Sequence, residues 1–365
     1  MRILLTVNLA WNILNFRMGI VRALMRAGHE VSVLAPGDGA ALEAEGLRHI
    51  PLEMDAKGLN PLSGIAMNAR MARHFRAERP DVILSWTIKN NIFGAMAARR
   101  VGIPFIPNVS GLGTAFLSGG ALQFVAQTLY RRVFRPLDTV FFQNAEDRDL
   151  FTARNLIQPS QAQLLPGSGI DLTRFSTAPI PGGSPVFLMI ARLLRDKGVE
   201  EFAQAARIVR ASHPEATFCL LGALDADNRS AIPEALLREW EAEGILRHLG
   251  TATDVRPHIA AAHCVVLPSY REGAPRTLIE AGAMARPVIT TDVPGCRAVV
   301  EKGKTGLLCE VRSGGSLAQA CMQFLGMSLE ARTAMGQAGR ARMESTYDEK
   351  LVVDAYLAAI ERAIA

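Results

Sequence analysis

The segment "CVVLPSYREGAPRTLIEAGAMARPVITTDVPG", residues 264–295, shows in one stretch how the chain is built. Two short apolar runs, residues 264–269 and 287–292, are typical of buried strands. Apolar residues recur at helical spacing between them, starting at Pro275, and proline suits the first position of a helix. Strands alternating with helices indicate a parallel sheet covered on both faces.

The same alternation extends in both directions from this segment. The apolar N-terminus, residues 1–16, is interpreted as a first strand rather than a signal peptide, with "RILLTV", residues 2–7, as the buried strand, followed by a helix over Arg17–Ala27. Further strands are expected at "EVSVLAP", "DVILSW", "PFIPNV", "TVFFQN", "VFLMIA", "TFCLLGA", "ILRHLG" and "GLLCEV". The periodicity stops over Pro166–Pro185, where Gly, Pro and Ser dominate, and this predicts a domain boundary.

We therefore predict an α/β protein with two doubly wound, Rossmann-like domains that face a central cleft. The expected boundaries are residues 1–168 for the first domain and 169–347 for the second. Residues 348–365 are expected to form a helix that packs back on the first domain. Ligands of such folds bind beyond the carboxyl ends of the strands, so the functional residues should lie in loops that follow strands.

Composition narrows the class of protein. The 365 residues are 49% hydrophobic and carry a net charge of +5, which suits an anionic ligand or an anionic membrane surface. No run of 18 apolar residues occurs, so we expect a soluble or peripheral protein, and no aromatic-interleaved basic motif predicts a nucleic-acid partner. Five cysteines lack metal-ligand spacing and are expected to be reduced core residues: 219, 264, 296, 309 and 321.

Two cations follow the strand "VFLMIA". Arg192 and Lys197 lie in "ARLLRDKG", residues 191–198, between a strand end and a helix start. Fixed cations beside unpaired backbone N–H groups bind phosphate, which predicts an anion site here. The alternative is two solvated cations on a surface loop.

Two carboxylates, Glu272 and Glu280, are eight residues apart in the opening segment. The backbone N–H groups of Gly273 and Ala274, at a helix start, can meet an anion. Carboxylates pair with neighbouring hydroxyls, so each glutamate is a candidate for binding a sugar diol. The alternative is that Glu272 caps the helix or is solvated, while Glu280 is an exposed helix charge.

These elements, with "GIDLTRF" at residues 169–175, occur in the order found in glycosyltransferase family 4, and essentially the whole chain resembles that family of retaining GT-B enzymes. The resemblance implies that Arg192 and Lys197 hold the donor diphosphate and stabilise it as it leaves. It also implies that Glu272 holds donor-sugar hydroxyls and that a phosphate oxygen takes the acceptor proton. The implied donor-binding residues are Gly273, Ala274, Arg276, Leu278 and Glu280, the last at the ribose.

The resemblance implies no cofactor besides the UDP-sugar donor and no metal ion. "DAD", Asp225–Asp227, looks like the D-x-D metal motif of the other glycosyltransferase fold, and two such aspartates can chelate a divalent cation. We expect a loop or capping role for it, because Arg192 and Lys197 take over the screening of the diphosphate.

A narrower resemblance lies in residues 85–116 and 221–250. They look like the subgroup that extends polyprenyl-diphosphate-linked sugars, which implies donors such as UDP-N-acetylgalactosamine or UDP-galactose and an enzyme at the cytoplasmic face of the cell membrane. The chain departs from the family after the first strand, where "NLAWNILNFRMG" replaces a Gly-Gly loop, and at Ser110, which replaces a histidine. Arg17, Lys89 and Ser110 are the expected acceptor or cleft residues.

One helix is a candidate membrane contact. Residues 119–137 combine apolar positions with a polar stripe at four-residue spacing: Gln123, Gln127, Arg131 and Arg135. A second basic face is formed by Arg70, Arg73, Arg76 and Arg79. Together they predict docking on anionic lipid. The alternative is a core helix with a solvated stripe.

Two rival functions fit the same motifs. A UDP-sugar 2-epimerase of this fold would use carboxylates as acid and base and release a sugar without an acceptor. A non-catalytic nucleotide-sugar-binding protein would retain the donor residues without turnover. A turnover assay separates the three hypotheses.

Overall fold

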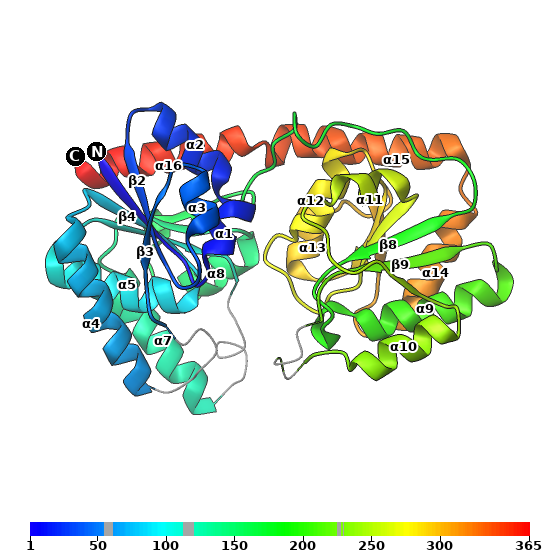
Figure 1. Cartoon of the computed structure of the whole chain (residues 1–365), viewed down its shortest axis with the longest axis horizontal. Coiled ribbons are helices and arrows are strands. Elements are labelled where there is room, and N and C mark those ends of the chain that lie inside the picture. The colour runs from blue at the N-terminus through cyan, green and yellow to red at the C-terminus, as the bar shows by residue number, and fades with distance from the viewer. Residues whose placement is uncertain (55–60, 112–119, 225–227, 229) are drawn as a thin grey trace. The chain divides into compact units, whose positions relative to one another are not determined.

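The computed structural model describes the chain except residues 55–60, 112–119, 225–227 and 229, and the side chains of residues 61–63 and 120–122. It divides into two compact units (Figure 1). Unit 1 comprises Met1–Gly169 and Glu349–Ala365, and unit 2 comprises Ile170–Asp348. Each unit is built on its own parallel sheet.

The sheet of unit 1 has the strand order β3-β2-β1-β4-β5-β6-β7, and every pairing is parallel. The order reverses between β1 and β4, because the chain first adds strands on one side of β1 and then on the other. Loops that follow β1 and β4 therefore leave the same edge at the switch point, where doubly wound folds bind ligands. The strands are β1 (Arg2–Thr6), β2 (Glu30–Ala35), β3 (Arg48–Pro51), β4 (Val82–Trp86), β5 (Phe105–Val109), β6 (Val140–Phe142) and β7 (Ala162–Leu164).

Helices cover both faces of this sheet, because alternate strand residues point to opposite faces. Leu4 and Ile83 pack in the cluster under α4, α5, α7 and α8, whereas Leu5 and Leu84 pack under α1, α2, α3 and α16 (Figure 1). The helices are α1 (Ala10–Phe16), α2 (Met18–Arg26), α3 (Ala40–Ala44), α4 (Pro61–Glu78), α5 (Ile88–Val101), α7 (Gly120–Phe134), α8 (Ala145–Ala153), the 3₁₀ turn η1 (Pro159–Gln161) and α16 (Glu349–Ile364).

The N-terminal interpretation was wrong after the first strand. β1 ends at Thr6, and residues 10–16 form the additional helix α1 before α2 begins at Met18. The reason is visible in the burial: Ala10 and Ile13, three residues apart, face the core from one side of a helix. The N–H of Ala10 also donates to the carbonyl of Pro36, which ties α1 to the end of β2.

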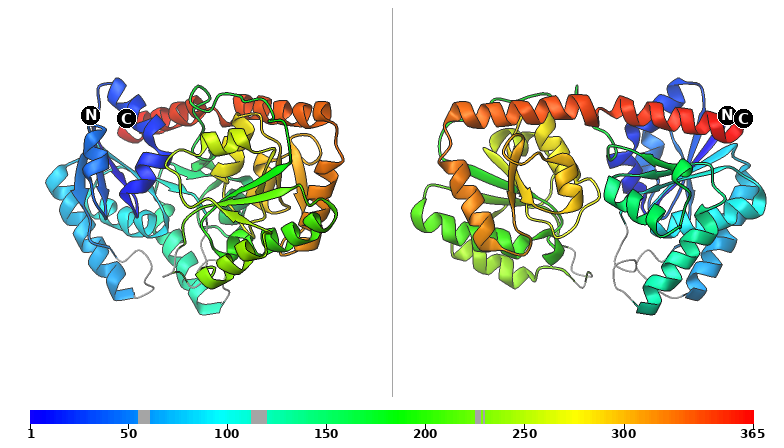
Figure 2. Two further views of the ribbon diagram at one scale, coloured as in Figure 1. Left: turned by 45° about the vertical axis from the view of Figure 1, so that its right-hand side comes forward. Right: turned by 180° about the vertical axis from the view of Figure 1, so that it is seen from behind.

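Helix α16 returns the end of the chain to unit 1. It contacts α2 on one face of the sheet, and both views show its end beside the N-terminus (Figure 2). Tyr356 is fully buried between Trp86 and Phe141, and its hydroxyl oxygen accepts a hydrogen bond of 2.9 Å from Asn108 Nδ2. Burial raises the pKa of Tyr356 to about 12, so the hydroxyl remains protonated.

The sheet of unit 2 has the order β10-β9-β8-β11-β12-β13, again with parallel pairs throughout. Its switch point lies between β8 and β11. The strands are β8 (Val186–Ile190), β9 (Thr217–Leu221), β10 (Arg247–His248), β11 (Cys264–Leu267), β12 (Val288–Thr291) and β13 (Gly306–Cys309). The helices are η2 (Arg195–Lys197), α9 (Val199–Ser212), α10 (Glu234–Ala242), α11 (Arg256–Ala261), α12 (Arg276–Ala283), α13 (Pro294–Val299), α14 (Gly314–Leu325), α15 (Leu329–Arg342) and the π turn η3 (Met343–Tyr347).

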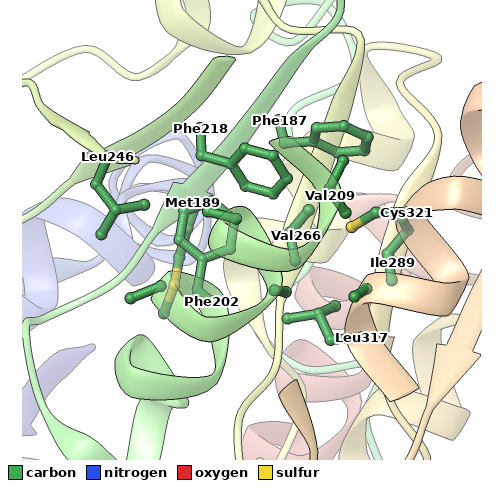
Figure 3. Packing of buried hydrophobic residues seen from close by; sticks show 14 of the residues in the cluster. Phe187, Met189, Phe202, Val209, Phe218, Leu246, Val266, Ile289, Leu317 and Cys321 are labelled. Carbon is green, nitrogen blue, oxygen red and sulfur yellow. The ribbon is translucent and has the colours of Figure 1, made fainter. Parts of the chain in front are cut away.

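One core cluster of unit 2 fixes β8 under α9 and α14 (Figure 3). Phe187 and Phe218 stack with ring centroids 4.8 Å apart, and Phe202 of α9 meets Phe218 edge-on at 5.3 Å. This packing anchors the strand whose following loop carries Arg192 and Lys197. All five cysteines are buried, as expected from the sequence.

The segment over Pro166–Pro185, expected to be a boundary, is tied to unit 2 by arginines. Arg340 donates to the carbonyls of Leu172 and Phe175, and the fully buried Arg286 donates to those of Ala178 and Pro179. Guanidinium groups thus satisfy backbone oxygens that have no regular secondary structure to pair with. Within the described residues, no helix is long and apolar enough to cross a membrane.

Candidate active site

The two loops at the switch point of unit 2 bring the predicted residues together. Residues 191–198 follow β8 and residues 268–275 follow β11. Lys197 Nζ lies 2.5 Å from Glu272 Oε1, and the two side chains are 20% and 14% exposed. A cation and a carboxylate, 75 residues apart in the sequence, therefore form an ion pair at the edge where this fold binds ligands.

Backbone contacts hold these loops against each other. The carbonyl of Asp196 accepts hydrogen bonds from the N–H of Tyr270 at 2.9 Å and from Ser269 Oγ at 3.2 Å. Gly198 has a φ of +79°, and a Cβ there would lie 2.1 Å from the carbonyl oxygen of Pro268. Only glycine allows the backbone at residue 198 to come this close to Pro268. The position of Lys197 therefore depends on the loop after β11 as well as on its own strand, β8.

Helix α13 packs closely against the loop that contains Glu272. A Cβ added to Gly295, the second residue of α13, would lie 2.2 Å from the carbonyl oxygen of Glu272 and 2.5 Å from that of Gly273. The loop backbone at Glu272 is thus set by the absence of a side chain on α13. Gly295 was not predicted as a site residue, although "VPG" after a strand is a signal for a close backbone approach.

Tyr270 was also missed. Its hydroxyl donates to Glu201 Oε1 at 2.8 Å, and Arg312 Cζ lies 4.8 Å from its ring centroid. Burial, together with Glu201, raises the pKa of Tyr270 to about 12. The side chain fastens the loop after β11 to α9, and no periodic pattern in the sequence marks such a contact.

Glu280 lies on α12 and pairs with Arg276, one turn earlier, at 2.9 Å. Its side chain is only 12% exposed. Burial raises the pKa of this carboxyl, and Arg276 offsets part of that shift. Glu280 is therefore a nearly buried carboxylate rather than the exposed helix charge that the alternative required.

The other predicted donor residues lie in the same region. Arg192 is exposed in the loop after β8, and Gly273 and Ala274 lie just before Pro275, the N-cap residue of α12. Leu278 is 1% exposed and packs in the core of unit 2, while its N–H donates to the carbonyl of Pro275. Its side chain is therefore part of the core rather than of the surface at this edge.

Among the described residues, no group of three or more His, Cys, Asp or Glu side chains could hold a metal ion. Asp225 and Asp227, the candidate metal motif, lie outside the described residues.

In unit 1, the predicted acceptor residues follow three adjacent strands. Arg17 comes after β1 and α1, Lys89 after β4, and Ser110 directly after β5. Arg17 is 9% exposed, and its guanidinium carbon lies 5.1 Å from the ring centroid of Trp86, within the range of a cation–π contact. Carboxyl ends of parallel strands share one edge, so all three residues belong to it.

We expect donor binding to depend on pH through Glu280. Because burial raises the pKa of this carboxyl, protonation begins at a higher pH than for an exposed glutamate. The KM for the donor should then rise as the pH falls through the raised pKa, because a protonated carboxyl is a weaker acceptor for hydroxyls. Glu280→Gln should show a higher KM that no longer changes with pH. A parallel pH dependence in the variant would contradict the assignment.

Comparison with known proteins agrees with this geometry. A model described as "Glycosyl transferase 4-like domain" matches residues 15–167, and one described as "Glycosyl transferases group 1" matches residues 184–326. The solved structure of Anabaena Alr3699/HepE with UDP-glucose superposes with a TM-score of 0.79 at 18% identity, covering 98% of both chains. The two doubly wound units define a GT-B protein, which confirms the predicted fold class.

The chain belongs to glycosyltransferase family 4, as its motifs predicted, and is a glycosyltransferase. It is 27% identical to the N,N'-diacetylbacillosaminyl-diphospho-undecaprenol alpha-1,3-N-acetylgalactosaminyltransferase of Campylobacter jejuni, over 97% of this chain and 96% of the relative. It is 24% identical to the UDP-Gal:alpha-D-GlcNAc-diphosphoundecaprenol alpha-1,3-galactosyltransferase of Escherichia coli, over 76% of this chain and 72% of the relative.

Proposed function

We propose that the chain transfers a hexose or N-acetylhexosamine from a UDP-sugar to a polyprenyl-diphosphate-linked saccharide, with retention of configuration. The observation that carries the donor half is the Lys197–Glu272 pair at the β8/β11 switch point. The acceptor class is supported by the two relatives above, whose names both specify an undecaprenol-diphosphate sugar. Surface polysaccharide or glycan assembly is the process such a transfer serves.

In this proposal, the cations act on the leaving group. Negative charge develops on the diphosphate as the bond to the sugar breaks, and Lys197 and Arg192 offset it. Fixed charges in a partly dehydrated site need no reorganisation at that moment, which is why such groups contribute strongly to rate. A leaving phosphate oxygen accepts the proton of the attacking acceptor hydroxyl.

The carboxylates in this proposal orient the donor. When the diphosphate binds, it takes over part of the contact that Lys197 makes with Glu272. Glu272 then accepts hydrogen bonds from hydroxyls of the transferred sugar. Glu280 accepts them from the ribose. Carboxylates are strong acceptors for such donors, and the eight-residue spacing along the loop and α12 separates the two sugar rings.

A mass-spectrometric screen tests the reaction. Purified protein is incubated with a panel of UDP-sugars and farnesyl diphosphate carrying N-acetylglucosamine or a disaccharide. The proposal expects one added sugar residue on the acceptor and stoichiometric UDP. Release of free sugar without acceptor would support an epimerase, and donor binding without any product would support a non-catalytic binding protein.

We expect this turnover to persist in excess EDTA. Protein cations replace a metal ion at the diphosphate, so removing divalent ions leaves the charge balance of the site unchanged. UDP release before and after chelation measures the effect. Loss of activity in EDTA that magnesium or manganese restores would instead assign a metal role, with Asp225 and Asp227 as the first candidates.

We further propose that unit 1 lies peripherally on the inner face of the cell membrane. On α7, the exposed side chains include Phe124 at 70% and Val125 at 52%, followed by Arg132. In the polar stripe of α7 and the residues after it, Arg135 is exposed. Gln123, Gln127 and Arg131 are half-buried, and Arg131 donates to the carbonyls of Arg154 and Asn155 at the end of α8.

The second basic face, on α4 and just after it, is largely exposed. Arg73, Arg76 and Arg79 are exposed, whereas Arg70 donates to the carbonyl of Glu53. Each basic residue near an anionic surface contributes about 1 kcal/mol, so several on α4 and α7, which cover the same face of the sheet, support reversible binding.

We expect Phe124→Ala with Arg132→Ala and Arg135→Ala to weaken sedimentation with phosphatidylglycerol vesicles. Raised salt should have the same effect, since the attraction is screened over about 10 Å. Arg22→Ala with Arg26→Ala is the matched control, because α2 covers the other face of the sheet. Equal loss in both variants, or a wild type that ignores these vesicles at low salt, would contradict this docking surface.

A further inference from the structure

Helix α1 presents the one strongly exposed tryptophan of the chain. Of the three tryptophans, Trp86 and Trp240 are 1% and 5% exposed, whereas Trp11 is 57% exposed. Leu9, just before the helix, is also 47% exposed. A large exposed indole beside another exposed apolar side chain is a candidate surface for binding a ligand or partner.

Packing of unit 1 does not explain this indole. Ala10 and Ile13 form the buried side of α1. Trp11 follows Ala10 in the helix and therefore points in a different direction from this buried side. Phe16 meets the indole edge-on, with ring centroids 5.1 Å apart and an interplanar angle of 84°. Phe16 therefore limits the side-chain rotamers of Trp11 but leaves the indole exposed. A ring held in one orientation can serve as a flat binding surface.

Amide side chains lie close to Trp11 along the chain, at positions 8, 12 and 15. Asn15, on the same side of α1 as Trp11, is exposed and donates from Nδ2 to the carbonyl of Trp11 at 2.9 Å. Asn12 Nδ2 donates to Asn8 Oδ1 at 2.6 Å. These bonds orient the amides, and each amide has further donor and acceptor capacity.

The location connects this surface to the acceptor side of the enzyme. Helix α1 immediately follows β1 at the β1/β4 switch point of unit 1. Arg17 follows α1 directly, and Lys89 is the second residue of α5, which follows the neighbouring strand β4. An aromatic ring, amides and two cations thus share one edge of the sheet.

We propose that Trp11 is the stacking surface for the terminal sugar of the diphosphate-linked acceptor. The assignment rests on the proposed function and adds the recognition element for the saccharide. A pyranose has an apolar face of C–H bonds and a rim of hydroxyls, which match the electron-rich face of an indole and the adjacent amides. The cations at the same edge match the diphosphate.

A lipid surface fits α1 less well. Residues 3–16 contain no charged side chain, so α1 itself offers no charge complement to anionic lipid. The amides at positions 8, 12 and 15 also favour a ligand with many hydroxyls. Lipid binding by Trp11 is therefore kept as an outcome of the test.

The kinetic test compares Trp11→Ala with Trp11→Phe, using farnesyl diphosphate carrying N-acetylglucosamine as acceptor. We expect the alanine variant to raise the acceptor KM about tenfold or more, since tryptophan is among the residues whose truncation costs the most binding free energy when a ligand covers it. The donor KM should change less than about twofold, and phenylalanine should recover most of the loss, because it keeps a π-face. Leu351→Ala, an exposed apolar residue of α16, is the control and should be unchanged.

A binding test needs no turnover. Because the other two tryptophans are buried, quenching of intrinsic fluorescence by acrylamide reports mainly on Trp11. The sugar-bearing probe should protect the wild type from quenching, whereas farnesyl diphosphate without sugar should protect it much less. Trp11→Phe should remove the quenchable signal.

The outcomes separate the two proposals. A wild type that transfers to the probe, with an unchanged acceptor KM in Trp11→Ala, overturns the assignment of Trp11 alone. Equal protection by farnesyl diphosphate or by phosphatidylglycerol vesicles shows that the ring meets lipid, which also overturns it. A wild type that neither transfers to the probe nor is protected by it overturns both the acceptor class and the stacking surface.

Discussion

Replacing Lys197 with alanine is expected to lower kcat by about 10²-fold or more, the scale of losing one preorganised charge at a developing anion. Lys197 Nζ lies 2.5 Å from Glu272, so the change also leaves a carboxylate that is 14% exposed without this partner. Arg192→Ala should act in the same direction. Steady-state release of UDP, with thermal unfolding measured on the same samples, tests the effect.

Two controls separate chemistry from stability. Arg195→Ala removes a cation two residues away, which is 55% exposed and pairs with Glu200, and should leave turnover nearly unchanged. The double variant Lys197→Ala with Glu272→Gln also removes the carboxylate that the single variant leaves unpaired. It should recover stability but not activity, because the effects of two substitutions at residues in contact do not simply add. A folded Lys197→Ala variant with unchanged kcat would rule out its role at the leaving group.

The second large effect is expected from Gly295→Ala, which alters no side chain that meets a substrate. The new methyl group would lie 2.2 Å from the carbonyl oxygen of Glu272 and 2.5 Å from that of Gly273, so the loop must move. A displacement of about 1 Å at a catalytic group can cost about 10²-fold in rate. We expect kcat/KM for the donor to fall by about that factor.

Gly315→Ala is the matched control for Gly295→Ala. Both glycines are second residues of helices, but a Cβ at Gly315 meets nothing within 4 Å. This variant should retain activity and be as stable as the wild type, or more so, since alanine favours a helix. Equal activity of the two variants would show that α13 does not set the loop at Glu272.

The sequence by itself determined the alternation of strands and helices, because buried strands and amphipathic helices leave local patterns. It also determined where chemistry should lie: the cations after "VFLMIA" and the carboxylates after "CVVLPS" follow strands, and strand ends are where this fold binds ligands. It could not distinguish the short helix α1 from a continuing strand, since seven mostly apolar residues fit both patterns.

Only the tertiary structure decided which of these residues meet. The sheet order, with β11 beside β8, brings Glu272 to Lys197, and strand order follows from packing across the whole unit rather than from either segment. The exposed side of α7 was likewise decided by a distant contact, because Arg131 pairs with carbonyls at the end of α8. Sequence periodicity shows which side chains are apolar. Which side chains are buried and which ion pairs form depend on residues that come close only in the folded chain.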